Sequence, residues 1–212
     1  MTMNSMVGPI RQYVMDRSEA YRKASDDHYD FWNEHIRFVY EEAVSLAQRY
    51  HADVTVVALG ALLHDIALIE KAGERKDHHL NGKILSEKIL ERFSCPEDIR
   101  DRVLGCVLNH RSPKNATNPE EMCVCDADIL AHFDNVPMLF NSAFNRNGVR
   151  LYEIRDWMRY TLEKEYQELS DGTRELFRDR YRLIMSVVMG DTRDTDKIQA
   201  GGGNDDTDQG RG

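Results

Sequence analysis

The sequence predicts an all-α fold in a single domain. Two observations predict it: apolar residues recur at spacings of three and four along almost the whole chain, and segments that alternate apolar and polar residues are few. Only five of the 212 residues are prolines, so helices meet few interruptions. A chain of this length is long enough to bury one sizeable hydrophobic core.

The composition is typical of a soluble globular protein, with 28 Lys and Arg against 37 Asp and Glu, 41% hydrophobic residues and a formal net charge of −9. It excludes a chain that is disordered, fibrous or membrane-spanning as a whole. It also argues against sequence-independent binding of a nucleic acid polymer, since neutralising phosphates requires clustered Lys and Arg. The longest apolar run, residues 54–63, is about half the length that a bilayer crossing needs, so we expect no membrane partner.

The amino-terminal and cysteine patterns both favour a cytoplasmic protein. A charge appears at Arg11 within the first residues, which have no uninterrupted apolar stretch, so they do not resemble a signal peptide. Only one residue separates Cys123 from Cys125, unlike the two of a zinc knuckle. We therefore expect four reduced thiols in the core: Cys95, Cys106, Cys123 and Cys125.

The first three expected helices cover about residues 10–24, 31–50 and 54–69. The first ends in a polar stretch at residues 25–27. Asp53 stands where a helix N-cap is favoured, and the helix that it opens is apolar all round, which is typical of a central helix. The second helix is amphipathic, with one apolar stripe made by Phe31, Phe38, Val39, Ala43, Leu46 and Ala47.

Apolar spacing marks three more helices in the middle of the chain. The fourth ends before Pro96, and the fifth covers about residues 99–108. The sixth begins at Asn118-Pro119-Glu120 and runs to about residue 133, because the segment before it has the composition of a loop and Pro is favoured in the first turn of a helix. The positions that mark the fourth helix are Gly82, Leu85, Ile89 and Phe93.

The carboxyl-terminal part is expected to cover this bundle. Residues 151–189 are amphipathic with a break at Asp171-Gly172, which predicts one or two helices. After Gly190 the chain has too few apolar residues to bury and is expected to be disordered. The expected organisation is an N-terminal helix packed on the core (1–27), the core itself (28–133), covering helices (134–190) and an acidic Gly-rich tail (191–212).

Ionisable residues occur at positions that the apolar periodicity predicts to be buried. His64 and Asp65 lie in the least polar segment of the chain, where an unpartnered carboxylate would cost several kcal/mol or take up a proton. Four residues on other helices also face the common interior by their spacing: His35, His79, His110 and Asp128.

Imidazole and carboxylate groups that converge in a low-dielectric interior suit a divalent cation, whose charge offsets the cost of burying the acids. His35, His64, Asp65 and Asp128 can supply four ligands to one ion. Such a set leaves positions open for water, as in a catalytic site, and its lack of cysteine argues against a structural zinc.

The order of these residues resembles the HD superfamily of metal-dependent phosphohydrolases. The signature of that superfamily is a His, an adjacent His-Asp pair and a distant Asp, which here are His35, the pair within Leu63-His64-Asp65-Ile66, and the last residue of Cys125-Asp126-Ala127-Asp128. The resemblance covers about residues 28–133 and includes Asp30-Phe31-Trp32-Asn33-Glu34-His35 and His79-Leu80-Asn81-Gly82. It implies an HD-type helical bundle with the active site among its central helices and with residues 28–133 as the metal-binding core.

The resemblance also implies a ligand set. His35, His64, Asp65 and Asp128 correspond to the ligands of the first metal, and Asp128 is favoured over the nearby Asp126. In two-metal members extra histidines follow the His-Asp pair, and His79 and His110 stand where those would be, with Asp65 bridging both ions. The chain departs from many relatives after the pair, where Ile66-Ala67-Leu68 replaces Ile-Gly-Lys, and after the final Asp, where Ile129-Leu130 replaces Arg-Leu.

Hydrolysis at such a metal assigns further roles. A divalent ion lowers the pKa of a coordinated water and neutralises a phosphoryl oxygen, and Asp65 or Asp128 could take the proton of the water. Cations are expected near the leaving phosphate, and the candidates are Lys76, Lys83, Arg111 and Lys114. We expect His78 to be only a neighbour of His79, and no role for His28, His51 and His132.

The expected function is therefore metal-dependent hydrolysis of a small phosphorylated metabolite, with a nucleotide favoured. The cofactor is a divalent ion drawn from Mn, Fe, Co, Ni, Zn and Mg, because N and O ligands do not select one of them. The alternatives are a phosphodiesterase for cyclic nucleotides or dinucleotides, a di-iron oxygenase, and a metal-binding sensor without turnover. The expected partner is the small substrate, and a homodimer remains open.

Overall fold

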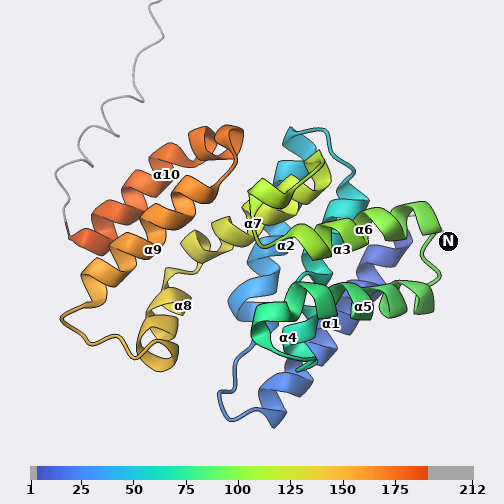
Figure 1. The fold of residues 1–212 in the computed structure, drawn as a ribbon, viewed down its shortest axis with the longest axis horizontal. Coiled ribbons are helices and arrows are strands. Elements are labelled where there is room, and N and C mark those ends of the chain that lie inside the picture. The colour runs from blue at the N-terminus through green and yellow to red at the C-terminus, as the bar shows by residue number, and fades with distance from the viewer. Residues whose placement is uncertain (1–3, 191–212) are drawn as a thin grey trace, which may run out of the picture.

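Helices follow one another along residues 4–190, the part of the chain that the computed structural model describes, and no strand occurs there (Figure 1). The predicted all-α fold is confirmed. The tail predicted for residues 191–212 lies outside the described residues. The helices are α1 (Asn4–Ala24), α2 (Arg37–Arg49), α3 (Val54–Leu63), α4 (Ile66–Ile69), α5 (His78–Arg92), α6 (Glu97–Asn109), α7 (Pro119–Asp134), α8 (Val136–Asn141), α9 (Ile154–Glu168) and α10 (Asp171–Met189).

Helix α3 is the centre of the bundle, as its uniformly apolar sequence predicts. Its residues from Val56 to Leu63 are all buried, and α1, α2, α6 and α7 pack around it. The carboxylate of Asp53 caps its first turn by accepting hydrogen bonds from the backbone N–H groups of Thr55 and Val56. A Cβ atom at Gly60 would lie 2.7 Å from Cβ of Cys106, so glycine is what allows α6 to approach α3 this closely.

The predicted helix over residues 54–69 is interrupted in the middle. Helix α3 ends at Leu63 and α4 begins at Ile66, with Asp65 out of helical conformation at φ −105° and ψ 15°. Gly82 of α5 packs against this break, since a Cβ atom there would lie 3.4 Å from the carbonyl oxygen of His64. Because of this break, His64 and Asp65 do not lie on a regular α-helix. Their side chains therefore need not point about 100° apart, as neighbouring side chains on a helix do.

The predicted helix over residues 31–50 also has an irregular start. Residues Trp32–Ile36 form a π-helical turn, and regular α-helix begins only at Arg37. The stripe predicted for this helix is largely buried, with Val39, Ala43, Leu46 and Ala47 in the core. Inserted π turns are frequent at functional sites, because they rotate the side chains before them relative to those after them.

Helices α9 and α10 pack side by side and reach the core mainly through α7 and α8 (Figure 1). The break between them falls at Leu169 and Ser170, just before the predicted Asp171-Gly172. In Figure 1 this orange pair stands apart from the central α3, while α8 lies between the pair and the amino-terminal helices. The covering helices α9 and α10 therefore flank the core on the side of α7 and α8.

None of the helices in the described residues combines the length and the apolar character needed to cross a lipid bilayer. The four cysteines are buried and unpaired, as expected for structural thiols.

Candidate metal centre

The four side chains expected to share one ion meet at one place. His35 comes from the π-helical turn, His64 and Asp65 from the break after α3, and Asp128 from α7. Nε2 of His35 lies 3.1 Å from Nε2 of His64 and 3.1 Å from Oδ1 of Asp128. Oδ2 of Asp65 lies 3.7 Å from Nε2 of His35 and 3.6 Å from Nε2 of His64. The residues are separated by up to 93 positions in sequence, so only tertiary packing brings them together.

These separations fit a shared ion. Nitrogen and oxygen ligands bind zinc-like ions at about 2.0–2.2 Å, so two adjacent ligands on one ion lie about 2.8–3.6 Å apart. Each histidine nitrogen lies 3.1–3.7 Å from the other histidine nitrogen and from one oxygen of each carboxylate, including the 3.7 Å between Nε2 of His64 and Oδ1 of Asp128. A packed core without a common ligand has no reason to gather two imidazoles and two carboxylates at this spacing.

A second group uses the other oxygen of Asp65. Its Oδ1 lies 3.3 Å from Nε2 of His78 and 3.8 Å from Nε2 of His110. The two imidazole nitrogens are 2.9 Å apart. Asp65 therefore faces the first group with Oδ2 and the second group with Oδ1, which is the geometry of a carboxylate that bridges two ions.

Backbone carbonyls fix the tautomers of three of these histidines. In His64, His78 and His110, Nδ1 lies 2.7 Å from the carbonyl oxygen of the residue three positions earlier. A carbonyl only accepts, so Nδ1 donates, and Nε2 of the neutral ring carries a lone pair. With both rings neutral, the lone pairs of His78 and His110 face each other at 2.9 Å, and a proton on one ring or a metal ion bound by both relieves this repulsion. The residues present thus fit a divalent metal.

The ionisation states agree with this fit. Burial raises the pKa of Asp65, but the charges of His64 and His35 outweigh burial and hold the pKa below its usual value. Burial also opposes ionisation of Asp128, where the hydrogen bond from His35 prevails and lowers the pKa. For His110, burial comes first and lowers the pKa to about 4. Ionised carboxylates and a neutral imidazole are the forms that bind a metal.

The sequence prediction placed His79 with His110 in the second group, whereas in the structure His78 stands beside His110. His78 contacts Asp65 and His110, whereas the candidate metal-holding groups in the described residues do not include His79. The spacing of residues along α5 could have shown that His78, rather than His79, faces the core. His78 stands 4, 7 and 11 positions before Gly82, Leu85 and Ile89, which is the helical repeat of one face.

His132, to which the sequence analysis gave no role, also lies at this centre. It stands one helical turn after Asp128 on α7, and a spacing of four was the signal for a shared face. Its ring stacks on that of His35 with centroids 5.7 Å apart. Nδ1 lies 3.0 Å from Oε1 of Glu165 on α9. Burial lowers the pKa of His132, but the charge and hydrogen bond of Glu165 outweigh it and raise the pKa to about 9.

A cavity of about 360 Å³ opens onto both groups and is large enough for a small ligand. Asp65, His78, His110 and Asp128 form its inner end. Much of the remaining wall comes from the segment before α2 and from α8, α9 and the turn between them. The apolar part of the wall is formed by Tyr29, Phe31, Leu68, Met138, Leu139 and Trp157. The covering helices α8 and α9 therefore complete the cavity.

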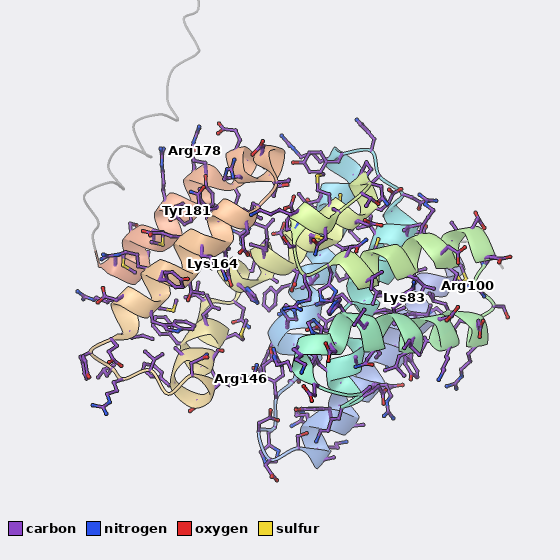
Figure 2. All side chains as sticks on the ribbon, viewed as in Figure 1. Lys83, Arg100, Arg146, Lys164, Arg178 and Tyr181 are labelled. Atoms are coloured by element: carbon purple, nitrogen blue, oxygen red, sulfur yellow. The ribbon has the colours of Figure 1, made fainter. Side chains whose placement is uncertain are left out.

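The cations that line this cavity are mostly not the ones expected. Of Lys76, Lys83, Arg111 and Lys114, only Arg111 contributes to the wall. Lys76 instead pairs with Glu74, Lys83 is exposed on α5, and Lys114 lines a different depression beside the start of α10. The other cavity cations are Arg75 and Arg146. Figure 2 shows Arg146 between the covering helices and the core, and Lys83 well away from it along α5.

Asp126, the competitor of Asp128 on α7, faces away from the metal groups. Its carboxylate accepts hydrogen bonds from the backbone N–H and the hydroxyl of Ser170, at the start of α10. Burial raises its pKa, but the two hydrogen bonds favour the charged form. Asp126 therefore ties the covering helices to the core, and the structure separates its role from that of Asp128.

We expect Asp126→Ala to lower the free energy of unfolding by about 1–3 kcal/mol, because Ser170 loses its acceptor in a buried place. The bound metal should stay unchanged. Urea denaturation and elemental analysis measure the two quantities. Asp171→Ala is the matched control, since the side chain of Asp171 is 95% exposed and its ion pair with Arg174 should contribute less than about 1 kcal/mol. Loss of metal from Asp126→Ala would contradict this division of roles.

Comparison with known proteins agrees with this arrangement. Residues 33–132 match the family model of the HD domain. The crystal structure of YpgQ from Bacillus subtilis superimposes with a TM-score of 0.66 and 20% sequence identity, over 92% of this chain and 97% of that one. A predicted HD superfamily hydrolase from an uncultured Thermotogales bacterium gives a TM-score of 0.59 and 19% identity, over 91% and 92% of the two chains. Identities this low show a shared fold.

A curated relative matches only in part. The tRNA (cytidine(56)-2'-O)-methyltransferase of Thermoplasma volcanium is 35% identical over 81 residues, which is 38% of this chain. The match spans 21% of the length of that protein. It therefore concerns a minor part of the methyltransferase. The HD model, by contrast, begins two residues before His35 and ends at His132, and so encloses every residue of the candidate metal-holding groups in the described part of the chain. Residues 33–132 of this chain are therefore an HD domain.

Proposed function

We propose that this chain is a metal-dependent phosphohydrolase that acts on a small phosphorylated metabolite, with a nucleotide as the favoured substrate. The observation that carries the proposal is the double group of imidazoles and carboxylates at the inner end of an open cavity. A divalent ion bound by such ligands supplies a nucleophilic water at neutral pH and neutralises charge on a phosphoryl oxygen.

The side chains define the roles around that chemistry. His35, His64, Asp65 and Asp128 would hold one ion, and Asp65, His78 and His110 would hold a second. The carboxylates of Asp65 and Asp128 are the acids of these groups, and either can accept the proton of the attacking water. The side chain of Asp128 is 23% exposed against 11% for Asp65, and both line the cavity, so both are accessible to water.

The cavity also supports the substrate class. Apolar and aromatic side chains along the wall suit an organic group, while arginines suit phosphate. A crystal structure of YpgQ contains ADP, and that chain superimposes on this one with a TM-score of 0.64 at 20% identity. This likeness favours a nucleotide as the first ligand to test.

A release assay tests the proposal. The protein is loaded in turn with Mn²⁺, Co²⁺, Ni²⁺, Zn²⁺, Fe²⁺ and Mg²⁺ and incubated with nucleoside mono-, di- and triphosphates. We expect release of phosphate or pyrophosphate with at least one metal, loss of release on chelation, and recovery on adding the metal back. Tightly bound metal without release from any nucleotide or sugar phosphate would reject the hydrolase and favour a metal-binding sensor.

The second histidine pair favours one other candidate function. Two ions bridged by Asp65 and flanked by His78 and His110 would also suit a di-iron oxygenase. Aerobic loading with Fe(II), followed by electron paramagnetic resonance, separates the two. A mixed-valence signal together with substrate-dependent oxygen consumption would support the oxygenase, and metal-dependent phosphate release without oxygen consumption would support the hydrolase.

A further inference from the structure

Three arginines line the cavity beside the metal groups, and their charges share one electrostatic setting. Arg75 lies in the 3-10 turn before α5, Arg111 follows α6, and Arg146 ends the π-helical turn after α8. Arginines elsewhere on this acidic chain often pair with carboxylates, as Arg17 does with Glu70 and Arg102 with Glu120. Within residues 4–190, none of the three cavity arginines forms such an ion pair. We call these three side chains the arginine rim.

Neutral groups position the rim. The guanidinium of Arg146 lies 4.7 Å from the ring centroid of Tyr29, over its face. Nη1 of Arg111 donates to the carbonyl oxygen of Lys76 at 3.0 Å. The carbonyl of Arg75 accepts from Nδ1 of His78 in the second metal group. The arginines are thus held near the cavity while their charges stay unneutralised by protein acids.

The acids of the cavity are already used. Asp65 and Asp128 belong to the metal groups, and Glu165 pairs with His132. When the two groups hold ions, the inner end of the cavity becomes cationic, and the rim adds three further positive charges. A phosphate monoester brings one phosphate group, which the metal centre can take alone. A ligand that also neutralises the rim needs further phosphate groups.

We propose that the arginine rim binds the phosphate groups beyond the one that is attacked, so that the substrate is a phosphoanhydride, namely a nucleoside di- or triphosphate. This inference rests on the proposed function for the reaction itself. Water forms the new bond to phosphorus, the anhydride P–O bond breaks with its electron pair on the departing phosphate, and the proton of the water passes to Asp65 or Asp128 and from there to solvent. Arg146 comes from outside the HD-matched residues 33–132 and gives the covering helices a part in substrate choice.

Equilibrium binding tests the inference without relying on turnover. The probes are AMP and α,β-methylene-ADP, whose phosphate chain cannot be hydrolysed, titrated calorimetrically into metal-free and Mn²⁺-loaded protein. We expect the methylene-ADP to bind more tightly than AMP in the Mn²⁺-loaded protein. Arg146→Gln, Arg111→Gln and Arg75→Gln should each weaken methylene-ADP roughly tenfold, because each removes a charge-assisted contact, and should change AMP by less than about threefold. The losses should shrink as salt is raised.

Arg150→Gln is the matched control. Arg150 is an exposed arginine four residues after Arg146 that does not line the cavity, and its removal should change neither affinity. Equal binding of AMP and methylene-ADP by the wild type, or equal losses of affinity for both ligands in the Gln variants, would reject the proposal that the arginine rim binds the additional phosphate groups. The proposed function fails separately: a rim that discriminates the two probes in a protein that hydrolyses nothing rejects only the hydrolase. A hydrolase that does not discriminate them rejects only the rim.

Discussion

Replacing Asp65 by Asn is expected to empty both metal groups at once and to lower phosphate release more than about 100-fold. Oδ2 of this residue faces His35 and His64, while Oδ1 faces His78 and His110, so one carboxylate serves both ions. Even a partner that only supports a metal ligand typically contributes 10–100-fold to metal affinity or activity, and a bridging ligand should contribute more. Asparagine keeps the size of the side chain but removes its negative charge.

Metal content per chain and the rate of release measure the two effects. Circular dichroism and the thermal midpoint check that the variant is folded, and we expect it to be so, because asparagine has nearly the size and shape of aspartate. Asp126→Asn is the matched control, since it changes a buried acid of α7 that contacts Ser170 rather than the metal groups. Two ions per chain in Asp65→Asn, with activity retained, would remove Asp65 from the centre.

The apolar pattern of the sequence contained most of the fold and part of the site. His35, His64, Asp65 and Asp128 could be singled out because each interrupts a pattern that predicts burial, and burial of a charge needs a partner. The pattern could not show that α3 stops at Leu63, since apolar residues continue from Leu63 to Ile66 and beyond. A run of hydrophobic residues predicts that a segment is buried, but it does not show where the backbone leaves the helical conformation.

The cavity cations were the least predictable part of the site. Lys83 lies on α5, whose first turn supplies His78, but on the exposed face of that helix, and Lys76 forms an ion pair with Glu74. Arg75 and Arg146 stand in turns, where no periodicity indicates which way a side chain points. Their place beside the metal groups depends on how α5 and α8 pack on the core, and this is a tertiary property.

The difference between His78 and His79 can be decided by experiment. We expect His78→Ala to lower the metal content from two ions to one and to reduce phosphate release more than about tenfold, because Nε2 of His78 lies 3.3 Å from the bridging Asp65 and 2.9 Å from Nε2 of His110. His79→Ala should keep both ions and nearly all activity. The two residues are neighbours at the start of α5, so each variant controls for any loss of helix stability in the other.

Metal titration into chelator-treated protein distinguishes these outcomes. The wild type and His79→Ala should show two binding steps, and His78→Ala should show one. Its surviving step should belong to the first group, whose histidines, His35 and His64, come from the turn before α2 and the end of α3 and are untouched by a change in α5.

Loss of the second step in His79→Ala rather than in His78→Ala would mean that α5 is rotated by one residue relative to its packing here. That rotation would also move Gly82 away from the His64 carbonyl, where a Cβ atom would lie at 3.4 Å. The close packing of α5 on the break is therefore tied to the choice of histidine, and a single titration tests both.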